Sequence, residues 1–383
     1  MSIQKRFATL ILALITVAGL AACKPAETPD VDGDTTVETT EIITTAAETE
    51  PEPATSPEEI RLNQLLESRI ELHFGDDGKF RIMALSDLHI PVGGIPEEGM
   101  ARVRQLVEKE KPDLIVLVGD NLMGDFNDED TFREALGSLV DYFEEQDIYW
   151  MHVYGNHDPE MGVSLEQQQA IYESYEHCLS KDPDKELTGV GNYVLPIYGS
   201  DSDEVKFLVW GIDSNSNLTE ADKQALFPLN STTFKGYDTV KYDYIHYDQI
   251  QWYHEASELI EEQFGRKVPG LMAFHIPLHE TYAAWLNRRA LEWEGEKGDT
   301  VSASAYNSGL FEILRGRGDV KAVVSGHDHL NNFMVNYAGI KLCYAGSVTT
   351  TSYGGTDTVR MFVLDESNPA DIHTYNSSFV RDE

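Results

Sequence analysis

Five apolar segments of this 383-residue chain each run directly into side chains that commonly bind metal ions. The segments are rich in β-branched and large apolar residues, which favours buried strands, and they span residues 80–85, 114–118, 148–153, 271–274 and 320–324. The polar residues that follow them are Asp87, His89, Asp120, Asn156, His157, Asp158, His275, His327 and His329. Sites in open α/β sheets form beyond the carboxyl ends of strands. We therefore expect all five polar groups to meet at one edge of one sheet.

Helical segments alternate with these strands along the chain. The apolar spacing predicts helices over residues 99–109, 131–145 and 247–264 and a further strand over 205–212. Residues 339–375 contain short strands separated by Gly and Asn turns, which indicates a second, more antiparallel sheet. The pattern as a whole predicts a layered α/β fold.

The polar groups offer oxygen and imidazole ligands without thiolate. Such a set suits divalent Mn, Fe, Zn or similar ions. There are too many candidates for one tetrahedral zinc, but they fill two sites if one carboxylate bridges. Two ions roughly 3.5–4 Å apart can clamp the attacking and leaving oxygens of a phosphoryl displacement. The seven candidate ligands are Asp87, His89, Asp120, Asn156, His275, His327 and His329.

The order of these blocks resembles that of the calcineurin-like metallophosphoesterases: Asp-x-His, Gly-Asp, Gly-Asn-His-Asp, His, and Gly-His-x-His. The resemblance extends from about Phe80 to about Tyr375. Finer features are similar to the branch of small purple acid phosphatases, namely Gly119-Asp120-Asn121, Phe274 to Leu278, Asn307 to Phe311, Ser325 to Phe333, and Leu342-Cys343-Tyr344. The resemblance implies two packed mixed β-sheets flanked by helices, an α/β/β/α sandwich.

The same resemblance implies a role for each residue. One metal ion would be held by Asp87, His89 and His329, the other by Asn156, His275 and His327, and Asp120 would bridge them. A metal-bridging hydroxide would be the nucleophile. His157 would protonate the leaving oxygen as general acid, and Asp158 would orient His157.

At two positions the sequence differs from particular branches of this superfamily. The protein Ser/Thr phosphatases of this superfamily carry an arginine shortly after the Gly-Asp block, and residues 121–126 contain none, which disfavours that branch. Purple phosphatases have a tyrosine ligand three residues after the bridging aspartate, where this chain has Met123.

Two further pairs of residues have alternative interpretations. Arg288 and Arg289 could bind the substrate phosphate, since arginine suits bidentate phosphate recognition, or they could be a solvated surface pair. Cys178 and Cys343 could form a disulfide or remain two buried thiols.

The N-terminus has the pattern of a targeting segment. Lys5 and Arg6 precede an apolar run over residues 7–20, which is shorter than a spanning helix. The run ends in Leu20-Ala21-Ala22-Cys23, which resembles a bacterial lipobox. We expect a lipoprotein signal peptide over residues 1–22, then lipidated Cys23 with an acidic Thr/Glu/Pro linker to residue 59, and a metallophosphoesterase domain over 60–383. An ordinary signal peptide that ends near a cysteine is the alternative.

Charge limits the partners of the chain. A net charge of −37 repels nucleic acid and anionic membranes. Membrane contact is therefore expected through the lipid anchor only. The protein is expected to be exported and to lie on the periplasm-facing side or the outer surface of the cell envelope. The expected partner is a small phosphorylated substrate, and the expected activity is phosphomonoester hydrolysis. The alternatives are a phosphodiesterase acting on nucleotides or other small diesters, and a non-catalytic surface lipoprotein. The sequence does not indicate an oligomeric state.

Overall fold

A computed structural model describes residues 56–227 and 241–380. The predicted lipidation site Cys23, the signal peptide and most of the linker lie outside these ranges. Within them, no helix has both the length and the apolar character that a bilayer crossing requires.

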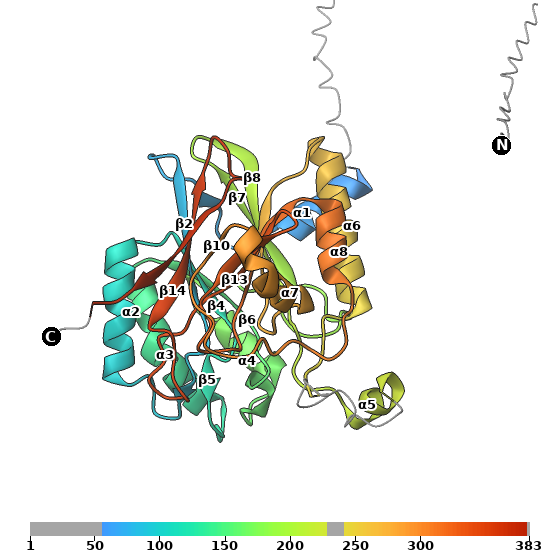
Figure 1. Cartoon of the computed structure of the whole chain (residues 1–383). Coiled ribbons are helices and arrows are strands. Elements are labelled where there is room, and N and C mark those ends of the chain that lie inside the picture. Colours follow the sequence, from blue (N-terminus) through green and yellow to red (C-terminus); the bar gives the residue numbers. More distant parts are fainter. Residues whose placement is uncertain (1–55, 228–240, 381–383) are drawn as a thin grey trace, which may run out of the picture. The chain divides into compact units, whose positions relative to one another are not determined.

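Two mixed β-sheets form the centre of the fold (Figure 1). The larger has eight strands in the spatial order β1 (Leu72–His73), β7 (Tyr193–Gly199), β8 (Ser202–Gly211), β9 (Gly270–Ala273), β11 (Val320–Ser325), β13 (Ile340–Tyr344), β12 (Met334–Tyr337) and β10 (Trp293–Glu294). The smaller has five, in the order β15 (His373–Ser378), β14 (Thr358–Asp365), β2 (Lys79–Leu85), β4 (Leu114–Val118) and β6 (Tyr149–Val153). A short parallel pair, β3 (Ile90–Pro91) and β5 (Leu122–Met123), follows β2 and β4.

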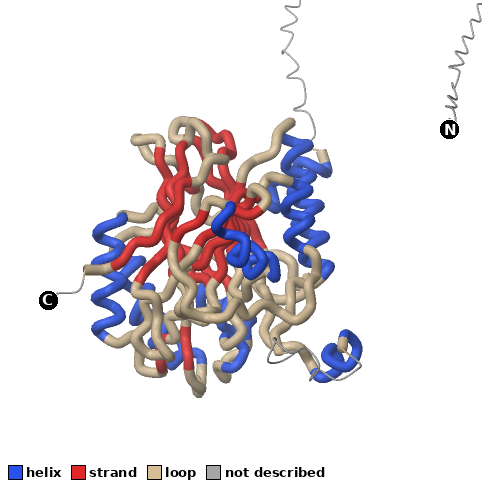
Figure 2. Tube along the Cα trace, in the orientation of Figure 1, coloured by secondary structure: helices blue, strands red, loops and turns tan. Residues whose placement is uncertain are grey.

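The helices cover the outer faces of these sheets (Figure 2). Those near the five-stranded sheet are α2 (Glu97–Glu110), α3 (Glu129–Glu145) and α4 (Leu165–Tyr172). Those near the eight-stranded sheet are α1 (Pro57–Leu66), α6 (Tyr247–Phe264), α7 (His279–Asn287) and α8 (Leu310–Arg317), while α5 (Glu220–Leu226) has no buried residue. The predicted α/β/β/α sandwich is therefore confirmed.

Strand alternation explains the layering. In β2, Ile82 and Ala84 join a core that also contains Val209 and Leu271 of the other sheet, so they lie between the sheets. Met83 points to the opposite face and packs with the helices, as expected for a period of two. Both faces of the central strands are thus apolar, which accounts for their continuous apolar sequence.

We expected the polar groups to follow the strands of one sheet, but they follow the strands of two. Those after β2, β4 and β6 belong to the five-stranded sheet, and those after β9 and β11 belong to the eight-stranded sheet. The expectation failed because parallel strand order along the chain does not reveal which strands pair. The groups still meet, because the two sheets stack face to face through a shared apolar core.

The two cysteines are free, buried thiols in different cores, so the disulfide alternative is wrong. Burial raises the pKa of each thiol to about 12, which leaves both unreactive near neutral pH.

The layer between the sheets supplies a stability prediction. Leu271 is completely buried there, so Leu271→Ala should lower the free energy of unfolding by about 2–5 kcal/mol. Leu286 on α7 is 61% exposed, and the same change there should alter stability by less than about 0.5 kcal/mol. Urea unfolding of both variants tests this, and equal effects would contradict the packing of the two sheets.

Candidate metal centre

The turn after β2 presents two candidate ligands in an unusual backbone conformation. Asp87 and His89 have φ values of 54° and 46°, in the left-handed region that non-glycine residues rarely adopt. A loop after β13 holds this turn through three side-chain hydroxyls, which donate to successive carbonyls: Ser347 to Asp87, Thr349 to Leu88 and Thr351 to His89. Strain that is retained in this way is typical of functional sites.

The first candidate metal group consists of Asp87, His89 and His329. All three are buried, and their ligand atoms lie within 4.8 Å of one another. The Nε2 atoms of His89 and His329 are 3.0 Å apart, and Asp87 Oδ1 is 3.3 Å from His329 Nε2. This spacing is suited to three donors around one ion.

The second candidate group consists of Asp120, His275 and His327. Asp120 Oδ2 lies 3.1 Å from His275 Nε2 and 4.0 Å from His89 Nε2, which belongs to the first group. One carboxylate oxygen therefore faces both groups. This position suits a carboxylate that would be shared by two metal ions.

Asn156 provides the clearest sign that the residues fit a metal ion. Its side-chain Oδ1 and Nδ2 are both buried, and neither has a hydrogen-bond partner among the described residues. An unsatisfied buried polar group costs roughly 1–3 kcal/mol, so a native amide in this state implies a missing partner. The Ser216 hydroxyl donates a hydrogen bond of 2.5 Å to the backbone carbonyl of Asn156 and holds this residue in position.

Two histidines present the same nitrogen to the groups. The Nδ1 atoms of His275 and His329 lie 2.7 Å from the Val118 carbonyl and 3.2 Å from the Gly354 carbonyl. A carbonyl only accepts, so each Nδ1 carries a proton, and each Nε2 is the nitrogen that would bind an ion in place of any proton on it.

Close approach of the loops requires glycine at two positions. A Cβ on Gly119, where φ is 86°, would lie 2.6 Å from His275 Nδ1. A Cβ on Gly155 would lie 2.2 Å from Asp120 Oδ1. These glycines explain why Gly precedes the ligand residue in both sequence blocks.

Electrostatics in the centre favour added positive charge. Burial acts to raise the pKa of Asp120, but the facing His275 outweighs it, and the pKa is lowered. Burial acts to lower the pKa of His275, but Asp120 and Asp87 raise it to about 10. Burial lowers the pKa of His327 to about 3, so this imidazole is neutral and able to bind a metal ion. Divalent cations would satisfy the two buried carboxylates.

The expected role of Asp158 requires correction. Its Oδ2 accepts hydrogen bonds from the backbone N–H groups of Gly155 and Asp120, so the carboxylate supports the loops and does not touch the ring of His157. The His157 Nδ1 lies instead 2.7 Å from Glu160 Oε2. Burial, and then the charge of Asp120, raise the pKa of Asp158 to about 8, which suits a buried group turned away from solvent.

Among the described residues, Arg288 and Arg289 make no recorded contact with either candidate metal group. The Arg288 guanidinium lies 3.8 Å from the ring centre of Trp285 and also faces Trp293. Its Nη1 donates to the Trp285 carbonyl, and Arg289 is exposed. Packing on tryptophan therefore occupies Arg288, and a role in substrate binding gains no support from its contacts.

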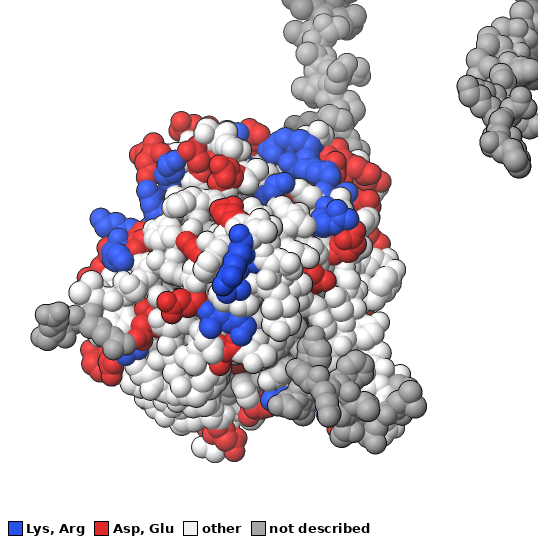
Figure 3. Space-filling view, viewed as in Figure 1, with Lys and Arg blue, Asp and Glu red and all other residues white. Residues whose placement is uncertain are grey.

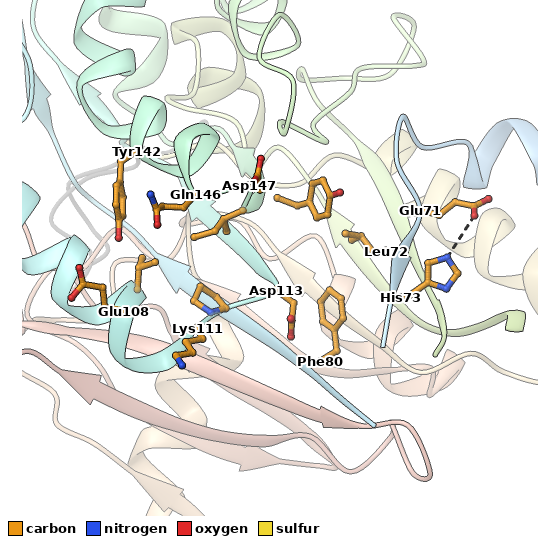
Figure 4. A pocket seen from close by; sticks show the side chains of 14 residues that line it. Glu71, Leu72, His73, Phe80, Glu108, Lys111, Asp113, Tyr142, Gln146 and Asp147 are labelled. Atoms are coloured by element: carbon orange, nitrogen blue, oxygen red, sulfur yellow. Dashed lines mark ion pairs between the residues drawn. The ribbon is translucent and has the colours of Figure 1, made fainter. Parts of the chain in front are cut away.

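One hollow of the described structure lies away from this centre. It has a volume of about 590 Å³ and is lined by residues that include Phe80, Asp113 and Tyr149 (Figure 4). These residues lie at or just before the starts of β2, β4 and β6, whereas the candidate ligands follow the ends of the same strands. The hollow is therefore on the opposite edge of the sheet.

Several supporting residues carried no recognisable signal in the sequence. The Tyr353 ring stacks on the His329 imidazole with centroids 4.1 Å apart, and its hydroxyl accepts from the His329 N–H. Ser216 and Thr349 were equally unpredicted, because single hydroxyl residues in loops are common. Glu160 lies three residues after His157, and this spacing in a tight turn was the one available hint.

Comparison with known proteins shows which family the chain matches. The family model of the calcineurin-like phosphoesterases matches residues 80–331, which include all seven candidate ligands. The Arabidopsis thaliana protein named "Probable inactive purple acid phosphatase 14" is 32% identical over 313 residues, covering 75% of this chain and 74% of the relative.

Two further proteins are similar to this chain. Phosphatase DCR2 of Saccharomyces cerevisiae is 29% identical over 334 residues, covering 78% of this chain and 54% of that protein. The crystal structure of a dimetal phosphatase from Danio rerio covers 79% of this chain and 99% of its own, at 13% identity and a TM-score of 0.47.

The geometry places Asp120 between the two candidate groups and His157 outside both of them. Asp120→Ala removes the carboxylate that faces both groups, and metal affinity should fall by more than the roughly 10- to 100-fold typical of losing an outer partner. His157→Ala should retain the metal content of the unmodified protein, because His157 belongs to neither group. Elemental analysis after dialysis measures both. A metal-free His157→Ala protein would show that His157 is a ligand.

Proposed function

The chain belongs to the calcineurin-like phosphoesterase family, and from this membership we propose that it is a dinuclear-metal phosphomonoesterase. The observation that carries the proposal is the pair of buried groups that share Asp120. Two bound divalent ions would supply a hydroxide near neutral pH and stabilise charge on the phosphoryl oxygens. The metal species is not specified by the ligand set, which suits Mn, Fe or Zn.

The residues of the chain have distinct tasks in this proposal. Asp87, His89 and His329 would hold one ion, Asn156, His275 and His327 would hold the other, and Asp120, which faces both groups, would serve both ions. His157 is 40% exposed, whereas the ligands are buried, so it can meet a substrate that enters from solvent. Its imidazole gives a proton to the leaving oxygen when the phosphorus–oxygen bond breaks.

The substrate is expected to be small and phosphorylated. On the face shown in Figure 3, lysines and arginines are interspersed with acidic residues. A continuous basic stripe would be expected for a nucleic-acid binder. The net charge of −37 also means that attraction of a phosphate depends on bound cations.

A direct comparison of two chromogenic esters tests the reaction. The metal-reconstituted protein should hydrolyse 4-nitrophenyl phosphate with a kcat/KM at least about tenfold above that for bis(4-nitrophenyl) phosphate, a difference of about 1.4 kcal/mol. The Asp120→Ala protein, purified in parallel, should hydrolyse neither, which excludes a contaminating phosphatase. A preference for the diester would favour a phosphodiesterase, and no turnover of either would favour a non-catalytic protein.

We further propose that the protein is exported and anchored to the cell envelope through lipidated Cys23. The support is the small-residue sequence before Cys23 and the acidic, Thr- and Pro-rich segment after it. A single acyl chain anchors only marginally, so firm retention would require the multiply acylated form.

Replacing the cysteine tests the anchor. Cys23→Ser should move the protein from the membrane fraction to the soluble fraction after export, with kcat/KM unchanged, because the linker separates the anchor from the domain. Cell fractionation with immunodetection measures this. An unmodified protein found entirely in the soluble fraction would contradict the anchor.

A further inference from the structure

His157 is a partly exposed residue that is held beside the metal centre. Its backbone N–H donates to Asp120 Oδ1 over 2.9 Å, which ties it to the shared carboxylate. Its ring centre lies 5.8 Å from that of His89, edge to face. The ring therefore lies beside the first metal group but contributes no atom to it.

The carboxylate of Glu160 contacts the Nδ1 atom of the His157 ring. The Nδ1 to Oε2 distance is 2.7 Å. Both residues belong to one tight turn, in which the Glu160 N–H donates to the His157 carbonyl over 2.9 Å. Pro159 lies between them and restricts the backbone of the turn. The contact is thus built into the local backbone.

Among the described residues, Glu160 supplies the carboxylate that contacts the His157 ring. Asp158 makes its hydrogen bonds through Oδ2, and its Oδ1 is buried and has no hydrogen-bond partner there. The carboxylate of Asp158 faces the backbone N–H groups of Gly155 and Asp120, and Asp120 belongs to the second metal group. Glu160 is therefore the carboxylate in a position to orient the imidazole. Because an ionised carboxylate only accepts hydrogen bonds, the Nδ1 atom must carry a proton, and Nε2 is directed away from Glu160.

We propose that Glu160 is the positioning residue for His157, in the role that the sequence had suggested for Asp158. This inference rests on the proposed phosphatase function. A hydroxide oxygen bonds to phosphorus as the bond between phosphorus and the ester oxygen breaks, and the electron pair of the broken bond stays on the ester oxygen. His157, which carries protons on both ring nitrogens before this step, passes its Nε2 proton to that oxygen and is left as a neutral imidazole protonated at Nδ1. Glu160 keeps its hydrogen bond to Nδ1 throughout and receives no proton.

The pair contributes little to folding, which makes it open to mutation. The side chains of His157 and Glu160 are 40% and 54% exposed, and exposed ion pairs are worth about 0–1 kcal/mol. A variant at Glu160 should therefore fold normally and retain its metal. Glu166, an exposed carboxylate in the first turn of α4, provides a matched control for loss of one negative charge.

Leaving-group dependence is the decisive kinetic measurement. Glu160→Ala should reduce kcat for an alkyl phosphate, whose leaving oxygen needs protonation, by about 10- to 100-fold, part of the range typical of general acids. The kcat for 4-nitrophenyl phosphate, whose leaving group departs unprotonated, should fall less than about threefold, and KM should change little for both. Glu166→Gln should behave like the unmodified enzyme with both esters.

A double variant shows whether the two residues act as a unit. Adding Glu160→Ala to His157→Ala should produce no further loss with the alkyl phosphate, because the group being positioned is already absent. Additive losses, or an equal loss with both esters, would overturn the inference.

A spectroscopic measurement is independent of turnover. In protein labelled with ¹⁵N-histidine, the ring signals assigned to His157 should show the Nδ1-protonated form, and Glu160→Ala should shift them. If the unmodified protein hydrolyses neither ester while this shift occurs, the proposed function fails and the contact stands. An unchanged signal in Glu160→Ala would overturn the positioning role.

Discussion

Two carboxylates buried where two sheets meet are the constraint on which the structure depends. Asp87 and Asp120 lie within reach of His275, and burial makes their negative charges costly unless cations are present. Imidazoles and an amide with unsatisfied atoms complete the surroundings. The sheets, loops and glycines around this point hold oxygen and nitrogen ligand atoms close together. The two buried negative charges favour the binding of cations.

The loops accept unfavourable backbone conformations to reach this arrangement. Asp87, His89, Asp120 and His327 all have positive φ. Hydrogen bonds between elements distant in the sequence stabilise them, including the His327 N–H to the Asp87 carboxylate, which connects the two sheets. Such interlocking means that the centre and the sandwich form as one structure, so changes in the loops are expected to affect both.

The Arabidopsis thaliana relative is named probable inactive, which directs attention to the residues around the centre as well as to the candidate ligands. The ligands are buried and define what can bind metal, whereas His157 and Glu160 are partly exposed. In the proposed mechanism, turnover depends on this partly exposed pair as well as on the buried ligands. A member of this family could keep its metal centre and lose turnover by changing only this exposed pair.

The sequence predicted the five strands that lead into the candidate ligands and the ligand types that follow them, because local apolar patterns and residue chemistry are written in consecutive positions. The second sheet expected over residues 339–375 is wrong, since β13 joins the eight-stranded sheet and β14 and β15 join the five-stranded sheet. The sequence also indicated the layered sandwich, through resemblance. Only the tertiary structure decided that the groups are divided between two sheets, that Glu160 and not Asp158 faces His157, and that Ser216 and Tyr353 support the centre. Sheet pairing, side-chain direction and contacts between distant loops depend on packing in three dimensions, and one turn can direct neighbouring carboxylates to opposite sides.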